Sequence, residues 1–174
     1  TVAQDLDKIV EAVKKFVEDV NAAQSSMNAS TRFNSDTLAK GILFGDSTVE
    51  NVRGRLTNVF FSRFEPGGDQ FGSLSSVGLS IGSNHTLEFD EEKFREAYAQ
   101  SPEQIEALFT DEEGGIGVAM EETLDALTGE SGIIPGKTEL LDGQKELMND
   151  RIAALSKLLD GKRARLERQF AGLE

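Results

Sequence analysis

Apolar side chains recur every three or four residues near the start of the chain, which is the pattern of an amphipathic helix. This row continues for three heptads and consists of Leu6, Ile9, Val13, Phe16, Val20, Ala23 and Met27. Val10 and Val17 widen the apolar stripe. A wide stripe indicates that the first helix meets more than one neighbour.

The segment from residue 25 to 45 is polar and irregular, so we expect a loop with about one short turn of helix. Its apolar side chains should pack back against the helices, and they are Leu38, Ile42, Leu43 and Phe44. A second helix is expected to begin at Ser47, because Ser47 and Glu50 have the spacing of a capping box. Pro and Gly in "EPGGDQFG" end this element.

Apolar and polar residues alternate on both sides of "GSNH", which predicts a β-hairpin beginning at Val77. Gly82 and Asn84 tolerate the positive φ of a tight turn. Two short helices should follow, the first capped by Asp90 and the second started by "SPEQ". Residues 77–109 are therefore predicted to form a hairpin-plus-two-helix module, with one core made by Leu79, Ile81, Leu87, Phe89, Phe94, Leu108 and Phe109.

A further helix should reach about Thr128, and "GESGIIPGK" should separate it from a long helix starting near Lys137. Two rows of the long helix repeat every seven residues. One row is Leu141, Met148, Leu155, Lys162 and Gln169, and the other is Ile152, Leu159, Leu166 and Leu173. The fold class predicted is mainly α, an elongated antiparallel helical bundle or coiled coil with one small β-hairpin module. We expect a single stalk-like helical domain over residues 1–174.

Charge and composition exclude several classes of function. The net charge is −13, with about −14 in residues 1–132 and about +1 in residues 133–174. Such a balance argues against a nucleic-acid partner and against an anionic membrane surface. The chain has no Cys and one His, so thiolate sites, His-based triads and His-rich metal sites are disfavoured. No apolar run is long enough to span a membrane, and the start without Met suggests a piece of a longer chain.

Acidic runs raise the question of a metal site. "FDEEKF" and "TDEEGG" lack the ligand spacing of a calcium loop, and acidic side chains at helix starts are explained by the helix dipole. His85 falls in the predicted turn and is expected to be exposed. We therefore expect no catalytic residue, no metal, no cofactor and no enzymatic activity.

Three blocks of the sequence resemble the C-terminal half of the flagellar filament cap (FliD) family, also called hook-associated protein 2. The first block resembles a helix of the family through Phe16, Val17 and Asn21. The module contributes the largest set, which is Gly78, Leu79, Leu87, Phe89, Asp90, Lys93, Phe94, Ala97, Pro102, Leu108 and Phe109. The end of the chain resembles the family's last block through Leu166, Gln169, Phe170, Leu173 and Glu174. The blocks keep the family's order over nearly the whole chain.

This resemblance implies a structural function: capping the distal end of the bacterial flagellar filament and promoting flagellin assembly. It implies flagellin and other cap subunits as partners, an export chaperone at the C-terminal end, and a location at the flagellum tip after export by the flagellar secretion apparatus. The alternatives are another flagellar axial protein at the hook–filament junction, or a cytosolic coiled-coil adaptor or chaperone-like binding module.

The resemblance also implies that a helix preceding this region packs beside the helices present here. We expect its absence to leave an apolar stripe without a partner, formed by Val10 and Val17 on the first helix and by the end of the last helix. The candidate partner and oligomer contacts are Leu159, Leu166, Phe170 and Leu173. Since large apolar patches rarely stay in water, we expect the chain to self-associate through its long helices.

Overall fold

The computed structural model describes residues 2–172 of the chain, with the side chains of residues 6–172. It divides into two compact units, residues 1–129 and residues 130–174. The mainly helical class with one small β element, predicted from the sequence, is confirmed. That the two units act together as one stalk domain stays a prediction.

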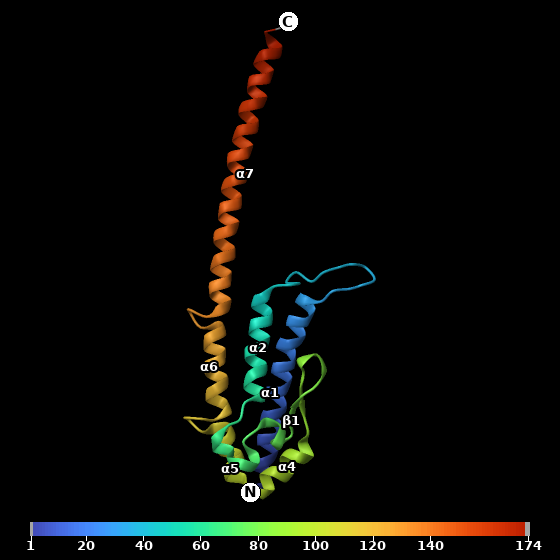
Figure 1. Cartoon of the computed structure of the whole chain (residues 1–174), viewed down its shortest axis with the longest axis vertical. Coiled ribbons are helices and arrows are strands. Elements are labelled where there is room, and N and C mark those ends of the chain that lie inside the picture. The colour runs from blue at the N-terminus through green and yellow to red at the C-terminus, as the bar shows by residue number, and fades with distance from the viewer. Residues whose placement is uncertain (1, 173–174) are drawn as a thin grey trace. The chain divides into compact units, whose positions relative to one another are not determined.

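The first unit holds six α-helices, three short 3₁₀ turns and two strands among its described residues. The α-helices are α1 (Val2–Thr31), α2 (Ser47–Phe61), α3 (Gly68–Phe71), α4 (Glu91–Gln100), α5 (Pro102–Thr110) and α6 (Ile116–Thr128). The 3₁₀ turns are η1 (Glu65–Gly67), η2 (Leu74–Val77) and η3 (Ser83–His85), and the strands are β1 (Leu79–Ile81) and β2 (Leu87–Phe89). Helix α1 runs beside α2 and beside the hairpin, and α4 and α5 gather at one end of the unit (Figure 1).

Helix α1 packs against the core with the predicted row and, more deeply, with the neighbouring row. Val10 is 2% exposed and Val17 is 9% exposed, so neither of them lacks a partner within the chain, and that prediction was wrong. Both belong to the core, and α1 packs against β2 and α2. Ala23 of the predicted row is exposed, and Gln24 is buried instead. Val13 of the predicted row is buried, and the centre of the buried stripe lies about one position from that row.

Helix α1 also extends beyond the predicted start of the loop, to Thr31. In this last part of the helix, Ser26 and Thr31 donate their hydroxyls to the carbonyls of Ala22 and Met27, one turn earlier. The loop that follows does not fold back: Leu38, Ile42, Leu43 and Phe44 are all exposed. Within the loop, Phe44 packs on Phe33, with ring centres 5.6 Å apart. Because these four side chains are exposed, the expectation that they pack back against the helices was wrong.

The capping residues of the helices differ from the prediction at two helices, α2 and α5. Asp46, not Ser47, caps α2, and its carboxylate accepts from the Thr48 N–H at 2.7 Å. Asp90 caps α4 as predicted and accepts from the Lys93 N–H at 3.0 Å. An Asp at the position before the first turn satisfies an N–H that has no partner inside the helix. Ser101 stands at the cap position of α5, but its side chain makes no capping hydrogen bond.

The hairpin is antiparallel and pairs Leu79 with Phe89 and Ile81 with Leu87. It begins at Leu79 rather than Val77, because η2 occupies the preceding residues. Gly78 has a φ of +86°, and a Cβ there would lie 2.5 Å from the Asp90 carbonyl oxygen, so only glycine fits this entry. The connecting turn has positive φ at Asn84, as expected, and at the exposed His85 rather than at Gly82.

Residues 77–109 form a strand, a turn, a second strand and two helices, in the predicted order. Leu79, Leu87, Phe94 and Leu108 are buried, and Ile81, Phe89 and Phe109 pack against the same cluster. Phe94 lies at its centre and makes edge contacts with the rings of Phe89 and Phe109. The predicted shared core of this module is confirmed.

The second unit consists mainly of α7 (Ile133–Ala171). The helix begins four residues earlier than predicted, at Ile133, and it includes Pro135 in its first turn. Proline is tolerated there because the first N–H groups have no partner inside the helix. None of the described residues of α7 is buried. No helix in the described part of the chain is both long and apolar enough to cross a membrane.

Candidate functional site

An apolar groove opens on the surface of the first unit between α1, α5 and α6. Its volume is about 780 Å³. It is lined by Ile9, Ala12, Val13 and Phe16 of α1, by Tyr98 of α4, by Ile105, Glu106, Phe109 and Thr110 of α5, and by Ile116, Gly117, Met120, Glu121, Leu124, Asp125 and Thr128 of α6. Most of these side chains are apolar, and the acidic ones stand on α5 and α6.

The groove accounts for one of the two apolar rows on α1. Val10 and Val17 face the interior of the unit, whereas Ile9 and Phe16 face the groove. An apolar stripe that is only partly covered within the first unit therefore exists, but it is not the row of Val10 and Val17 that we expected. It is formed by the other row and completed by α5 and α6, so it could not be identified from α1 alone.

The electrostatic character of the groove is acidic. Residues 96–136 contain ten Asp or Glu residues and no Lys or Arg. Glu106, Glu121 and Asp125 lie on the groove walls. The Glu106 carboxylate accepts a hydrogen bond from the Tyr98 hydroxyl at 2.6 Å, which fixes it at one edge of the groove. The groove therefore suits an apolar surface carrying basic side chains.

The predicted contact residues on the last helix lie on an exposed face of α7. Leu159 is 63% exposed, Leu166 is 51% exposed and Phe170 is 69% exposed. Leu173, the fourth candidate, lies outside the described residues. Leu159 and Leu166 are seven residues apart, so they share one side of the helix. Their role as contacts stays a prediction, but their exposure is consistent with it.

Basic side chains gather along the second half of α7. Residues 151–171 contain six Lys or Arg and two Asp or Glu. Four of the basic residues surround a shallow depression at Gly161, which is lined by Ala154, Lys157, Leu158, Gly161, Lys162, Arg165 and Arg168. This end of α7 has the opposite charge to the groove.

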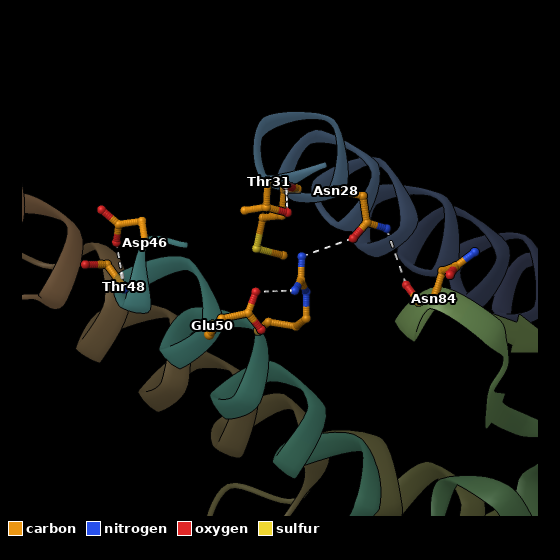
Figure 2. A network of polar contacts seen from close by, with 8 residues as sticks. Asn28, Thr31, Asp46, Thr48, Glu50 and Asn84 are labelled. Atoms are coloured by element: carbon orange, nitrogen blue, oxygen red, sulfur yellow. Dashed lines mark hydrogen bonds and ion pairs between the residues drawn. The ribbon is translucent and has the colours of Figure 1, made fainter. Parts of the chain in front are cut away.

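A polar network holds α1, α2 and the hairpin turn together. The guanidinium of Arg53, on α2, donates to Glu50 at 2.6 Å and to Asn28 of α1 at 3.0 Å. The side-chain amide of Asn28 in turn donates to the carbonyl of Asn84 in the hairpin turn at 3.4 Å (Figure 2). Arg53 is only 8% exposed, so this cation is paired inside the α1–α2 interface.

A second polar contact fixes the hairpin against α1. Asn21 donates its side-chain amide to the Leu87 carbonyl and accepts from the Leu87 N–H. The Asn21 side chain therefore hydrogen-bonds the main-chain N–H and C=O of Leu87 at the edge of β2. In the sequence, Asn21 stands out only through the family resemblance, which does not indicate a role as a strand partner.

An ion-pair cluster joins α1 to α4 on the surface. Lys14 of α1 contacts Glu91 at 2.5 Å, and Arg95 contacts both Glu91 and Asp7 at 2.8 Å. The hydrogen bonds from Lys14 and then Arg95 hold the pKa of the Glu91 carboxyl below its ordinary value. Hydrogen bonds to Asp7 and then Glu91 raise the pKa of Arg95. This partly exposed cluster links α4 to α1.

Among residues 2–172, no group of three or more His, Asp or Glu side chains is placed to hold a metal ion. Two surfaces of the described residues are candidates for function: the groove and the exposed face of α7. The sequence indicated the α7 face through its heptads. It could not indicate the groove, whose walls come from three separate helices.

Comparison with known proteins gives consistent results. The family model described as "Flagellar hook-associated protein 2 C-terminus" matches residues 1–174. The polar flagellar hook-associated protein 2 of Vibrio parahaemolyticus is 27% identical over 175 residues, which is 99% of this chain and 26% of that protein. The A-type flagellar hook-associated protein 2 of Pseudomonas aeruginosa is 26% identical over 179 residues, 100% of this chain and 37% of that protein. The chain thus spans between a quarter and two fifths of the length of these relatives.

The fold is shared with a solved structure. The crystal structure of the flagellar cap protein FliD D1-D2-D3 domains from Escherichia coli matches with a TM-score of 0.64 and 22% sequence identity. The match covers 74% of this chain and 35% of that chain.

Proposed function

The chain belongs to the flagellar hook-associated protein 2 family, and from that premise we propose that it is the stalk region of a filament cap protein. In this role it supports a cap on the distal end of the bacterial flagellar filament and promotes flagellin assembly beneath it. The match of the family model over residues 1–174 carries the proposal. The shared fold with the Escherichia coli flagellar cap protein supports it.

The proposed partners are flagellin and other subunits of the same cap. A large exposed apolar surface on a protein usually marks an interface, and α7 exposes such side chains along much of its length. An export chaperone at the C-terminal end belongs to the same proposal, because that end of α7 exposes Phe170 among basic residues. The proposed location is the flagellum tip, outside the cell, after export by the flagellar secretion apparatus. The family is a structural one, and we propose no catalytic role.

Complementation by a chimera tests this function. Residues 1–174 replace the matching C-terminal region of the Vibrio parahaemolyticus polar protein, in a strain that lacks that protein. We expect restored filaments and swimming, whereas a non-functional chimera leaves flagellin in the culture medium. The unaltered Vibrio parahaemolyticus protein, returned to the same strain, serves as the positive control.

The location of the chimera separates the alternatives. Antibody-labelled electron microscopy should find the chimera at the distal tip of the filament. Label at the base would favour a protein of the hook–filament junction. Retention of a stable chimera in the cytoplasm would favour a coiled-coil adaptor and contradict the cap proposal.

A further inference from the structure

Three polar side chains on α1 and α2 hold buried atoms that have no hydrogen-bond partner among the described residues. Gln24 of α1 is 1% exposed, and neither its amide nitrogen nor its amide oxygen is paired. On α2, the Thr57 hydroxyl and the Nε–H of Arg53 are also inaccessible and unpaired. Buried polar groups in proteins are nearly always hydrogen-bonded, because an unpaired one gives up its bonds to solvent without replacement. These atoms therefore need a partner.

Two contacts that join α1 to α2 bracket these side chains. Asn28 accepts from Arg53 at 3.0 Å, and farther along the interface the rings of Phe16 and Phe60 lie 6.3 Å apart between centres. The residue number rises on α2 as it falls on α1, so the two helices are antiparallel, as Figure 1 also shows.

The spacing along each helix places Gln24 and Thr57 at the same level of this interface. Gln24 precedes Asn28 by four residues, and Thr57 follows Arg53 by four. Residues four apart lie on the same side of an α-helix, one turn from each other. Because the helices are antiparallel, one turn back on α1 and one turn forward on α2 lead in the same direction. The unpaired atoms of both helices therefore come together one turn from the contact between Asn28 and Arg53.

The unpaired atoms match the hydrogen bonds of a water molecule. The Nε–H of Arg53 and the amide nitrogen of Gln24 donate, the amide oxygen of Gln24 accepts, and the Thr57 hydroxyl does either. Water also does both, and an internal water typically makes about three hydrogen bonds to buried polar groups. A neutral occupant is favoured over an anion, because Arg53 already pairs with the Glu50 carboxylate at 2.6 Å.

We propose that Gln24, Arg53 and Thr57 hold one ordered water molecule inside the first unit, between α1 and α2. The water extends the polar network of Figure 2, in which Asn28 also reaches the hairpin turn through the Asn84 carbonyl. It fixes the register of α1 on α2, since a shift by one turn would separate its partners. This inference concerns the packing of the first unit and does not depend on the capping role.

A crystal structure of the 174-residue chain, at a resolution that shows ordered solvent, tests the site directly. We expect one water at about 2.7–3.2 Å from the Gln24 amide and from at least one of the Arg53 Nε and the Thr57 hydroxyl. A direct hydrogen bond from Gln24 to Thr57 or to Arg53, with no water between them, would overturn the proposal. A Gln24 side chain turned to solvent would overturn it as well.

NMR spectroscopy gives an independent measurement in solution. A water molecule held inside the protein tumbles with it, so the side-chain amide protons of Gln24 should show cross-peaks to water that have opposite signs in NOE and ROE spectra. Absence of these cross-peaks in the parent chain would contradict a held water.

Conservative variants of Thr57 test whether its hydroxyl belongs to the site. Thr57→Val keeps the shape of the side chain but removes one partner of the water, so it should weaken the Gln24 cross-peaks and lower the melting temperature. Thr57→Ser retains the hydroxyl and should retain the cross-peaks. Thr128→Val is the matched control, because the exposed Thr128 hydroxyl donates to the Leu124 carbonyl, and both quantities should stay as in the parent. Unchanged cross-peaks in Thr57→Val would remove Thr57 from the site and overturn the proposal as stated.

Discussion

Asn21 and Leu87 are joined by two hydrogen bonds that run in opposite directions. The Asn21 amide donates to the Leu87 carbonyl at 2.9 Å, and the Leu87 N–H donates to the Asn21 carboxamide oxygen at 2.7 Å. The side chain thus acts toward β2 as a neighbouring strand would. The contact fixes the hairpin on α1 across 66 residues of sequence.

Asn21→Ala removes both hydrogen bonds and leaves the Leu87 main chain without its partner. We expect a loss of about 1–3 kcal/mol in the free energy of unfolding, measured by urea denaturation. Asn21→Asp should also destabilise the protein, because the carboxylate cannot donate to the Leu87 carbonyl. Ser26→Ala, an exposed position on the same helix, is the control and should change the stability by less than about 0.5 kcal/mol. Equal effects of the two Ala variants would contradict a specific role for Asn21.

Arg53→Lys tests the paired cation between α1 and α2. The guanidinium reaches Glu50 and Asn28 with two different nitrogens, and one ammonium cannot reproduce this fork. We expect a cost of about 1–2 kcal/mol in the free energy of unfolding. Arg55→Lys on the same helix is the matched control, because Arg55 is exposed and makes one hydrogen bond with Asn51. A neutral result for Arg53→Lys would show that its two contacts contribute little.

Phe94→Ala tests the centre of the module core. The ring is fully buried and lies 5.5 Å from the ring of Phe89 and 6.2 Å from that of Phe109, measured between centres. We expect a loss of about 3–5 kcal/mol, from transfer and cavity terms together. Phe89→Ala should cost less, because Phe89 is only half-buried. Phe61→Ala is the control at an exposed ring and should be within about 0.5 kcal/mol of the parent, as judged from thermal or urea unfolding.

The pH dependence of stability should report on Glu91. Its carboxyl pKa is lowered in the folded chain by hydrogen bonds from Lys14 and Arg95. The stabilisation is present above the unfolded pKa of about 4.3 and is lost as the pH falls through the lower folded pKa. The difference in melting temperature between the parent and Glu91→Gln should therefore shrink on acidification. Glu92→Gln, one residue on and exposed, serves as the control; a difference that persists at low pH would assign the effect of Glu91 to packing rather than to charge.

Local signals in the sequence located most elements of the fold. The alternation around "GSNH" identified both strands of the hairpin, and Asp90 identified the start of α4. These features depend on turn and cap chemistry within a few residues, which the sequence carries directly. Errors occurred where two local signals competed, as at Asp46 and Ser47, or where a proline was taken as a break although Pro135 fits a first helical turn.

Contacts between distant segments could not be deduced in the same way. The loop containing Ile42 and Phe44 is apolar enough to predict burial, yet these side chains are exposed, since apolar composition does not supply a surface to pack against. Arg53 is charged and yet buried, because Asn28 from another helix meets it. In both cases the outcome depends on which neighbour is near, and a periodic pattern does not contain that information.

The sequence by itself determined that α1 has a wide apolar stripe and that the end of α7 is an apolar row among basic residues. Periodicity and composition are sufficient for both, because a helix fixes the angular position of every side chain. Only the tertiary structure decided that Val10 and Val17 lie in the core while Ile9 and Phe16 line an open groove with α5 and α6. The reason is physical: a helix presents its whole stripe at once, and which part of it is covered depends on where segments about a hundred residues away are placed.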